Sequence, residues 1–260
     1  MKTILEEILN LNNHEIESIS NNHELSMNSR IVKLFHSNEN EYIQSELDPK
    51  DTSTYQTFID TVVARAEWEW SHWWKKGQLK ENHQEAIPLL TDMWMTSSPG
   101  RSRSYAETLA KNRKKPWSAA FISFIMQRAG AGSYFLYADM HWDYIKAAKI
   151  AADKENTNEL YWLRDVKNRK PLVGDIICYS RPTDIFPRVL TFENAGKNIR
   201  SSAHCDIVVK VNEKSIDVIG GNKGDKSNQS VAKESLSLDN NGLIDKSYFK
   251  RLFGIMSVWP

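Results

Sequence analysis

Cysteine is scarce in this chain of 260 residues, which contains only Cys178 and Cys205. Disulfide-dependent small domains carry several cysteine pairs, and structural zinc sites need closely spaced ligands, so two distant cysteines exclude both as the basis of the fold. The 7 histidines are scattered and form no convincing ligand spacing with Asp or Glu. We therefore expect a fold that depends on its hydrophobic core, with no metal and no cofactor.

Long hydrophobic runs are also lacking. Glu6 and Glu7 interrupt the N-terminus, and no stretch stays apolar for the length needed to span a bilayer. The formal net charge is +1, so no overall field attracts nucleic acid or an acidic membrane. We expect a protein made in the cytoplasm without a signal peptide or transmembrane segment, so activity outside the cytoplasm would require a dedicated export apparatus.

The chain divides by composition into two segments. Residues 1–54 are rich in Asn, Glu and Ser, with short apolar groups, which predicts a helical N-terminal extension that ends in the turn-forming residues 48–53. From Tyr55 onward apolar residues recur at helical spacing, so we expect one domain over residues 55–260. Four tryptophans at 68, 70, 73 and 74 favour core packing between helices over a carbohydrate-stacking face.

Residues 115–130 predict the central helix of this domain. Large apolar side chains lie at the spacing of a buried helical stripe, and Pro116 and Gly130 are suited to its start and its end. Ser118 then lies in the first turn, where unpaired amide groups favour an anion or a developing oxyanion. A serine at this position is also a good helix cap, so its position alone does not identify a nucleophile.

The second half of the chain changes from helical to strand periodicity. Segments rich in β-branched residues at 172–179, 205–211, 215–219 and 252–259 are separated by turn residues, which predicts antiparallel strands. Helices followed by strands are typical of the α+β class. The polar segment 181–203 predicts a long loop, and loops of this length in a compact domain are often functional. His141 lies in a predicted helix at 137–152, where we favour a buried, hydrogen-bonded histidine over one that lines a pocket.

Candidate catalytic residues follow from the strand that begins near His204. Alternate residues share a face, so we expect His204 and Asp206 to face the central helix, with Cys205 buried behind the sheet as a small apolar thiol. Asn222 follows the next strand, where its amide would orient the imidazole. The set then contains a hydroxyl nucleophile at a helix start, a histidine base and an orienting group.

Four sequence blocks in a fixed order resemble a known family. PWSAAFISFIMQRAG (116–130), PLVGDIICYSR (171–181), AHCDIVV (203–209) and IGGN (219–222) resemble the bacterial family DUF2272, which is similar to the NlpC/P60 and CHAP papain-like peptidoglycan hydrolases. The resemblance implies a papain-like domain in which Ser118 is the nucleophile, His204 the base and Asn222 the orienting residue, with Asp206 as an alternative. Those hydrolases have cysteine where this chain has Ser118, so neutral His204 would have to accept the serine proton.

Two functional hypotheses follow from this resemblance and from the candidate residues Ser118, His204 and Asn222. The first is a peptidoglycan amide-bond hydrolase, an amidase or endopeptidase, delivered as an antibacterial effector with an immunity partner or as a lysis enzyme. The second is a catalytically inactive papain-like module that binds cell-wall fragments or a protein partner. Acyl transfer or ester cleavage on lipids would use the same residues. A hydrogen bond between Ser118 and His204 in an open cleft would favour catalysis, whereas a cleft filled by residues 181–203 would favour binding or autoinhibition.

Overall fold

The computed structural model describes residues 52–75, 79–112, 115–224, 229–245, 247 and 251–258. The predicted N-terminal extension therefore lies outside the described residues, apart from 52–54, which begin the first described helix within the segment expected as a linker. The described helices are α4 (Thr52–Lys75), α5 (Ala86–Thr96), α6 (Arg103–Lys111), α7 (Ser118–Arg128), α8 (His141–Lys154) and the short 3-10 helix η2 (Gly132–Tyr134). None of the described helices is long and apolar enough to cross a membrane.

The strands form one antiparallel sheet, so the chain has the α+β architecture that the sequence predicts. They are β1 (Tyr161–Asp165), β2 (Ile176–Ser180), β3 (Ala203–Val211), β4 (Ser215–Lys223), β5 (Ser230–Ser237) and β6 (Leu252–Val258). Their spatial order is β1-β6-β2-β3-β4-β5. The sequence analysis missed β1 and β5, which lie at the two edges, and α6. In β1 three consecutive residues are buried, and in β5 the buried residues are sparse, so neither strand has the alternating pattern on which the prediction relied. The segment of α6 is polar and basic and was predicted as a lead-in to the central helix, although the hydroxyl of Ser102 caps its start.

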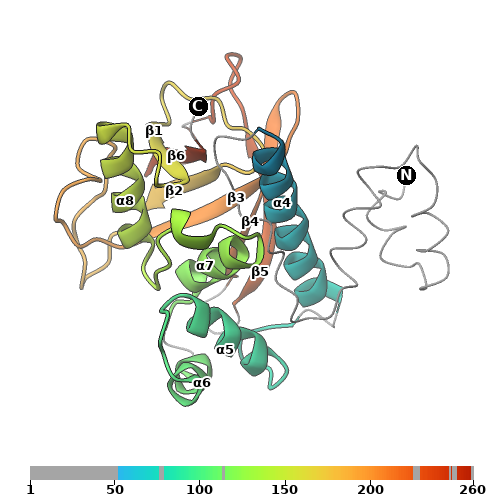
Figure 1. Ribbon diagram of the computed structural model, residues 1–260. Helices are drawn as coiled ribbons and strands as arrows, with labels where there is room; N and C mark the ends of the chain where they lie inside the picture. Colours follow the sequence, from blue (N-terminus) through green and yellow to red (C-terminus); the bar gives the residue numbers. More distant parts are fainter. Residues whose placement is uncertain are drawn as a thin grey trace. The chain divides into compact units, whose positions relative to one another are not determined.

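Helix α7 is the centre of the domain. It contacts β3 and β4, while α4 and α8 contact the sheet on either side of it (Figure 1). All its residues from Ser118 to Met126 are buried, as expected of a helix that is apolar on every side. Close approach to the sheet depends on Gly221, since a Cβ atom there would lie 2.6 Å from Phe121 Cβ. Sequence and structure therefore agree on the central helix.

The tryptophan-rich helix α4 packs against this centre. Trp73 is fully buried and stacks on Trp117 with 5.2 Å between ring centroids, and Trp70 packs against the same apolar cluster. The interpretation of these tryptophans as core residues is confirmed for Trp73. Trp68 is half-buried and stacks on His72 at 4.7 Å.

Cys178 and Cys205 form a disulfide between β2 and β3. The two residues are directly opposite each other in the strand register, with 4.3 Å between their Cα atoms. The expected free thiol at Cys205 is therefore wrong. The expected side is wrong as well, because Cys205 and Ile207 belong to the apolar cluster that includes α7, whereas Val208 belongs to a second cluster on the other side of the sheet.

A buried carboxyl on α4 should make stability depend on pH. Burial raises the pKa of Glu69 to about 7, above its usual 4.5, and outweighs the charges of Arg65 and Arg128. The folded state therefore holds this proton to a higher pH than the unfolded state does. The stabilisation that comes from this protonated Glu69 is present below about pH 4.5 and is lost as the pH rises towards 7. Asp175, whose pKa burial raises to about 6, acts in the same direction.

We expect Glu69→Gln to raise the free energy of unfolding at pH 8 by on the order of 3 kcal/mol while leaving it nearly unchanged at pH 4. Urea denaturation at the two pH values measures this difference. The exposed Glu85→Gln is the matched control and should change neither value. Equal effects of Glu69→Gln at both pH values would contradict the assignment.

Candidate active site

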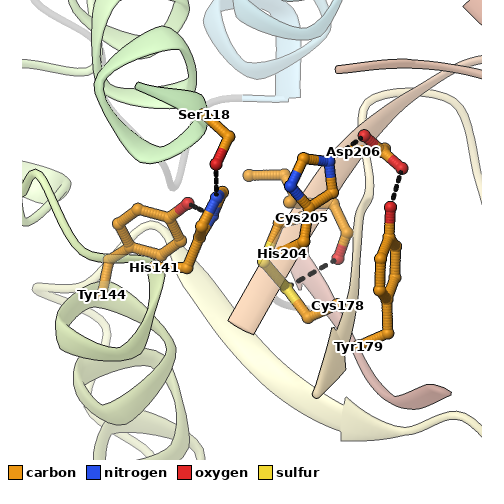
Figure 2. Close-up of a disulfide and its surroundings, with 9 residues drawn as sticks. Ser118, His141, Tyr144, Cys178, Tyr179, His204, Cys205 and Asp206 are labelled. Atoms are coloured by element: carbon orange, nitrogen blue, oxygen red, sulfur yellow. Dashed lines mark hydrogen bonds and ion pairs between the residues drawn. A yellow bond between two sulfur atoms is a disulfide. The ribbon is translucent and has the colours of Figure 1, made fainter. Parts of the chain in front are cut away.

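Ser118 and His141 meet where two helices begin. Ser118 is the first residue of α7 and His141 is the first residue of α8. Ser118 Oγ lies 2.6 Å from His141 Nε2, with the Ser118 residue 5% exposed and the His141 residue 4% exposed (Figure 2). His141 is therefore buried and hydrogen-bonded, as the sequence analysis favoured, but its partner is the candidate nucleophile.

The surroundings of His141 keep its ring neutral. Burial lowers the pKa of His141 well below 6.5, and the nearby His204 and Arg181 lower it further, although Asp206 opposes them. The positive end of the α8 dipole also disfavours an imidazolium at this position. A neutral imidazole has one nitrogen with a free lone pair, so His141 has the protonation state that a general base requires.

Tyr144 completes a chain of three side chains. Its hydroxyl is hydrogen-bonded to His141 Nδ1 from one turn further along α8, so the two rings share a helix face. Burial raises the pKa of Tyr144 well above 10, so the hydroxyl stays protonated. When its oxygen accepts the Nδ1 proton of His141, the Nε2 lone pair is directed at the Ser118 hydroxyl.

A second polar cluster surrounds Asp206 on β3. Its Oδ1 lies 3.0 Å from His204 Nε2, while its Oδ2 accepts hydrogen bonds from the Tyr179 hydroxyl at 2.8 Å and from Lys223 Nζ at 3.0 Å. Burial would raise the pKa of Asp206, but His204 and Lys223 outweigh it and hold the pKa well below 3.8. Asp206 is therefore ionised. Gly220 makes room for it, since a Cβ atom there would lie 1.8 Å from Asp206 Oδ1.

His204 joins the two clusters. Its ring lies between His141 and Asp206 (Figure 2), with 5.2 Å between the His204 and His141 ring centroids. The residue is 1% exposed, and its Nδ1 atom has no hydrogen-bond partner within the described residues. A buried ring nitrogen without a partner costs stability, so His204 is a candidate functional residue.

Asn222 has a different contact from the one predicted. Its side-chain oxygen accepts a hydrogen bond from the Trp117 backbone N–H at 3.2 Å, and the Trp117 indole N–H donates to Glu81 at 3.0 Å. Asn222 adopts a φ of 60°, a conformation that asparagine tolerates better than most residues. Asn222 therefore fixes the residue before Ser118, and the expected contact with His204 is replaced by this one.

The predicted site residues thus converge, but their pairing differs from the prediction. Asn222 contacts the residue before Ser118, and the His204 ring lies beside that of His141, but the hydrogen-bond partner of Ser118 is His141. His204 is bonded to Asp206, which precedes Val208 by two residues on β3 and is expected on the same side of the sheet, away from α7. Sequence reasoning missed His141 as a site residue. The available signal was His141 and Tyr144 three residues apart on one helix face.

The segment between β2 and β3 is a long irregular loop, as predicted. It spans residues 181–202 and packs on α8, with Lys149 Nζ 4.8 Å from the Phe192 ring centroid. Arg181 N donates to Ser202 O at 2.9 Å and closes the loop at its base. The low exposure of Ser118 and His141 shows that the site is closed in this conformation.

No three His, Cys, Asp or Glu side chains in the described ranges are grouped so as to hold a metal ion. A family sequence model described as "Uncharacterized protein conserved in bacteria (DUF2272)" matches residues 67–252, a range that includes every site residue named above. No curated protein and no solved structure matches the chain.

Proposed function

The chain belongs to the DUF2272 family of bacterial proteins, and we propose that it is a hydrolase in which Ser118 attacks an acyl carbon with His141 as its general base. The observation that carries this proposal is the distance of 2.6 Å between Ser118 Oγ and His141 Nε2. A neutral histidine at this distance can accept the hydroxyl proton as the serine attacks, so the residues have the roles of nucleophile and base.

The reaction would proceed through an ester on Ser118. As the new bond between Oγ and the acyl carbon forms, the serine proton moves to His141 Nε2 and then to the leaving amine. The backbone amides of Ala119 and Ala120 are suited to bind the oxyanion. Phe121 N donates to the Trp117 carbonyl at 2.9 Å and begins the helical hydrogen-bond pattern of α7, so the two amides before it have no acceptor within the helix. Water then attacks the ester, and the acid product and free Ser118 are released.

His204 and Asp206 would support the second half of this reaction. Asp206 accepts the Nε2 proton of His204, and in the neutral form of this ring Nδ1 has a lone pair that can accept a proton from the attacking water. The carboxylate also favours the imidazolium that forms on His141 during turnover. This role differs from the base for Ser118 that the sequence predicts for His204.

The substrate we propose is an amide bond in peptidoglycan stem peptides. The order of the sequence blocks resembles that of NlpC/P60 and CHAP hydrolases, and a buried helix packed on an antiparallel sheet is compatible with a papain-like domain. Delivery to the periplasm as an antibacterial effector with an immunity partner, or release as a lysis enzyme, would bring the protein to this substrate. The predicted N-terminal extension is our candidate for the segment that serves delivery or partner binding.

The burial of the site favours one alternative. Ser118, His141 and His204 are all nearly inaccessible, which is also the arrangement expected of a papain-like module that has lost catalysis and binds cell-wall fragments or a protein partner. In that case the three side chains form a structural polar network. Turnover would distinguish the two functions.

We expect the full chain to release fragments from purified peptidoglycan, with mass spectrometry showing one new amine and one new carboxyl per cut. A serine-directed phosphonate probe should label Ser118 in the wild type and should label His141→Gln far more slowly. If the wild type is inert and only Ser118→Cys cuts, Ser118 is not a working nucleophile and the proposal fails. If the wild type and Ser118→Cys are both inert but the protein sediments with insoluble peptidoglycan, the binding-module function replaces the hydrolase proposal.

A further inference from the structure

Helix α8 has an outer face that the proposed chemistry does not use. His141 and Tyr144 point towards the start of α7, and consecutive residues in a helix point about 100° apart, so Trp142 lies on a different side of α8, where it packs against the main apolar cluster. Trp142 and Lys146, one turn apart, both line a cavity of about 780 Å³ between α8 and the loop of residues 181–202. A cavity of this size suits a small ligand.

Trp142 is a buried donor that lacks an acceptor. The residue is 7% exposed, and its indole N–H has no hydrogen-bond partner within the described part of the chain. An indole N–H is a donor only, so an oxygen acceptor that comes within reach of it would satisfy it. This observation points to a ligand that carries oxygen acceptors.

The charged residues that line the cavity are all cationic. They are Lys146, Arg188 and Arg200. Lys146 Nζ lies 5.1 Å from the Trp142 ring centroid and donates to Asn198 at 3.2 Å. Within the described ranges neither arginine has a salt bridge. The charge of Arg200 does act on the Asp143 carboxyl, where it opposes the rise in pKa that burial and Asp139 cause. Three cations and an unpartnered donor favour an oxyanion.

A neighbouring cavity has a mixed lining. It measures about 510 Å³, shares Trp142 and Lys146 with the first, and is also lined by the apolar Leu136, Tyr137 and Ile150 and by the acidic Asp139 and Asp143, so an anionic group is favoured only in the first cavity. Leu136 is exposed there. The two cavities together match a ligand with an anionic end and an apolar side chain, since each part would meet its own complementary lining.

We propose that these cavities bind a carboxylate-bearing peptide, with its carboxylate between Arg188, Arg200 and the Trp142 indole N–H. That these cavities bind such a peptide does not depend on the proposed function. Only the view that the bound peptide is the substrate rests on it. Because Trp142 follows His141 directly in α8, a peptide held here lies beside the helix that carries the proposed base. The cavity thus selects acidic peptides before the bond to be cut reaches Ser118.

Isothermal titration calorimetry on the full-length Ser118→Ala protein tests binding without turnover. The probes are acetyl-Leu-Glu-Ala with a free terminal carboxylate, its neutral counterpart acetyl-Leu-Gln-Ala-amide, and inorganic phosphate. We expect the acidic peptide to bind at least tenfold more tightly than the neutral one. Arg188→Gln and Arg200→Gln should each weaken it about tenfold. Lys197→Gln removes an exposed cation of the same loop that does not line the cavity, and should leave affinity unchanged.

Equal affinity for the two peptides, or an equal loss in Lys197→Gln, overturns the inference. Binding of phosphate without binding of the acidic peptide overturns it as well, since the site would then be a phosphate site. Because Ser118→Ala cannot turn over, these results do not depend on catalysis. Tight binding of the acidic peptide beside an inert wild type would keep the cavity assignment and reject the proposed hydrolase.

Discussion

Ser118→Ala is expected to lower kcat on peptidoglycan fragments by about 10³-fold or more, because it removes the attacking oxygen and leaves the rest of the site intact. His141→Gln should cost a similar factor, since the hydroxyl then has no base at 2.6 Å. The double variant should be no slower than either single variant, because the two residues act as a unit. Steady-state rates of amine release measure all three.

Ser123→Ala is the matched control for Ser118→Ala. Ser123 is a second buried serine of α7, and its hydroxyl donates to the Ala138 carbonyl at 2.8 Å. The hydroxyl also accepts a hydrogen bond from the Ala138 N–H at 3.1 Å, so its removal should cost about 1–3 kcal/mol of stability while leaving kcat within a few-fold of wild type. His204→Gln provides the critical comparison. A loss in His204→Gln as large as expected for His141, together with a functional His141→Gln, would restore the sequence-based assignment of His204 as the base for Ser118.

The periodicity of apolar residues predicted the central helix and the core strands, where that periodicity is most regular. The apolar residues of 115–130 recur at a single period, and α7 is found there from Ser118 to Arg128. The core strands β2, β3, β4 and β6 were predicted from their β-branched residues. By contrast, β1 and β5 become strands mainly through pairing with β6 and β4, and pairing of distant segments leaves little trace in local sequence.

In the candidate active site, too, local sequence did not predict which side chains from distant segments contact each other. Ser118 and His204 were found because each lies in a recognisable block, but which histidine contacts the serine depends on how α8 packs beside α7. The disulfide between Cys178 and Cys205 likewise depends on the register of β2 against β3, which sequence spacing does not reveal. Long-range geometry therefore decided the roles among residues that sequence had already selected.

Asp206 connects the catalytic proposal to the stability of the fold. Its carboxylate is shared by His204, Tyr179 and Lys223, and the side chain of Lys223 is itself buried and also pairs with Glu234 at 2.7 Å. Because the pKa of Asp206 is held well below 3.8, its stabilisation is present above about pH 3.8 and is lost only as the pH falls through that lowered value. At neutral pH the full contribution is present.

Asp206→Asn is therefore expected to lower the free energy of unfolding at pH 7 by about 3–5 kcal/mol, because it leaves the buried Lys223 ammonium without its main counter-charge. Thermal unfolding should show a Tm lower by about 10 °C. Asp217→Asn, the same change on the adjacent strand β4 at a half-buried position, should alter stability by less than about 0.5 kcal/mol. Adding Lys223→Met to Asp206→Asn should recover part of the loss.

The double variant Asp206→Asn/Lys223→Met distinguishes two roles for the polar network around Asp206. If Asp206 only stabilises the fold, Asp206→Asn/Lys223→Met should regain activity along with stability. If Asp206 also fixes the proton on His204 Nε2, stability should recover while kcat stays at least tenfold below wild type, because the His204 tautomer is no longer held. An unchanged Tm in Asp206→Asn would contradict both roles, since a buried carboxylate with three donors cannot be removed without effect.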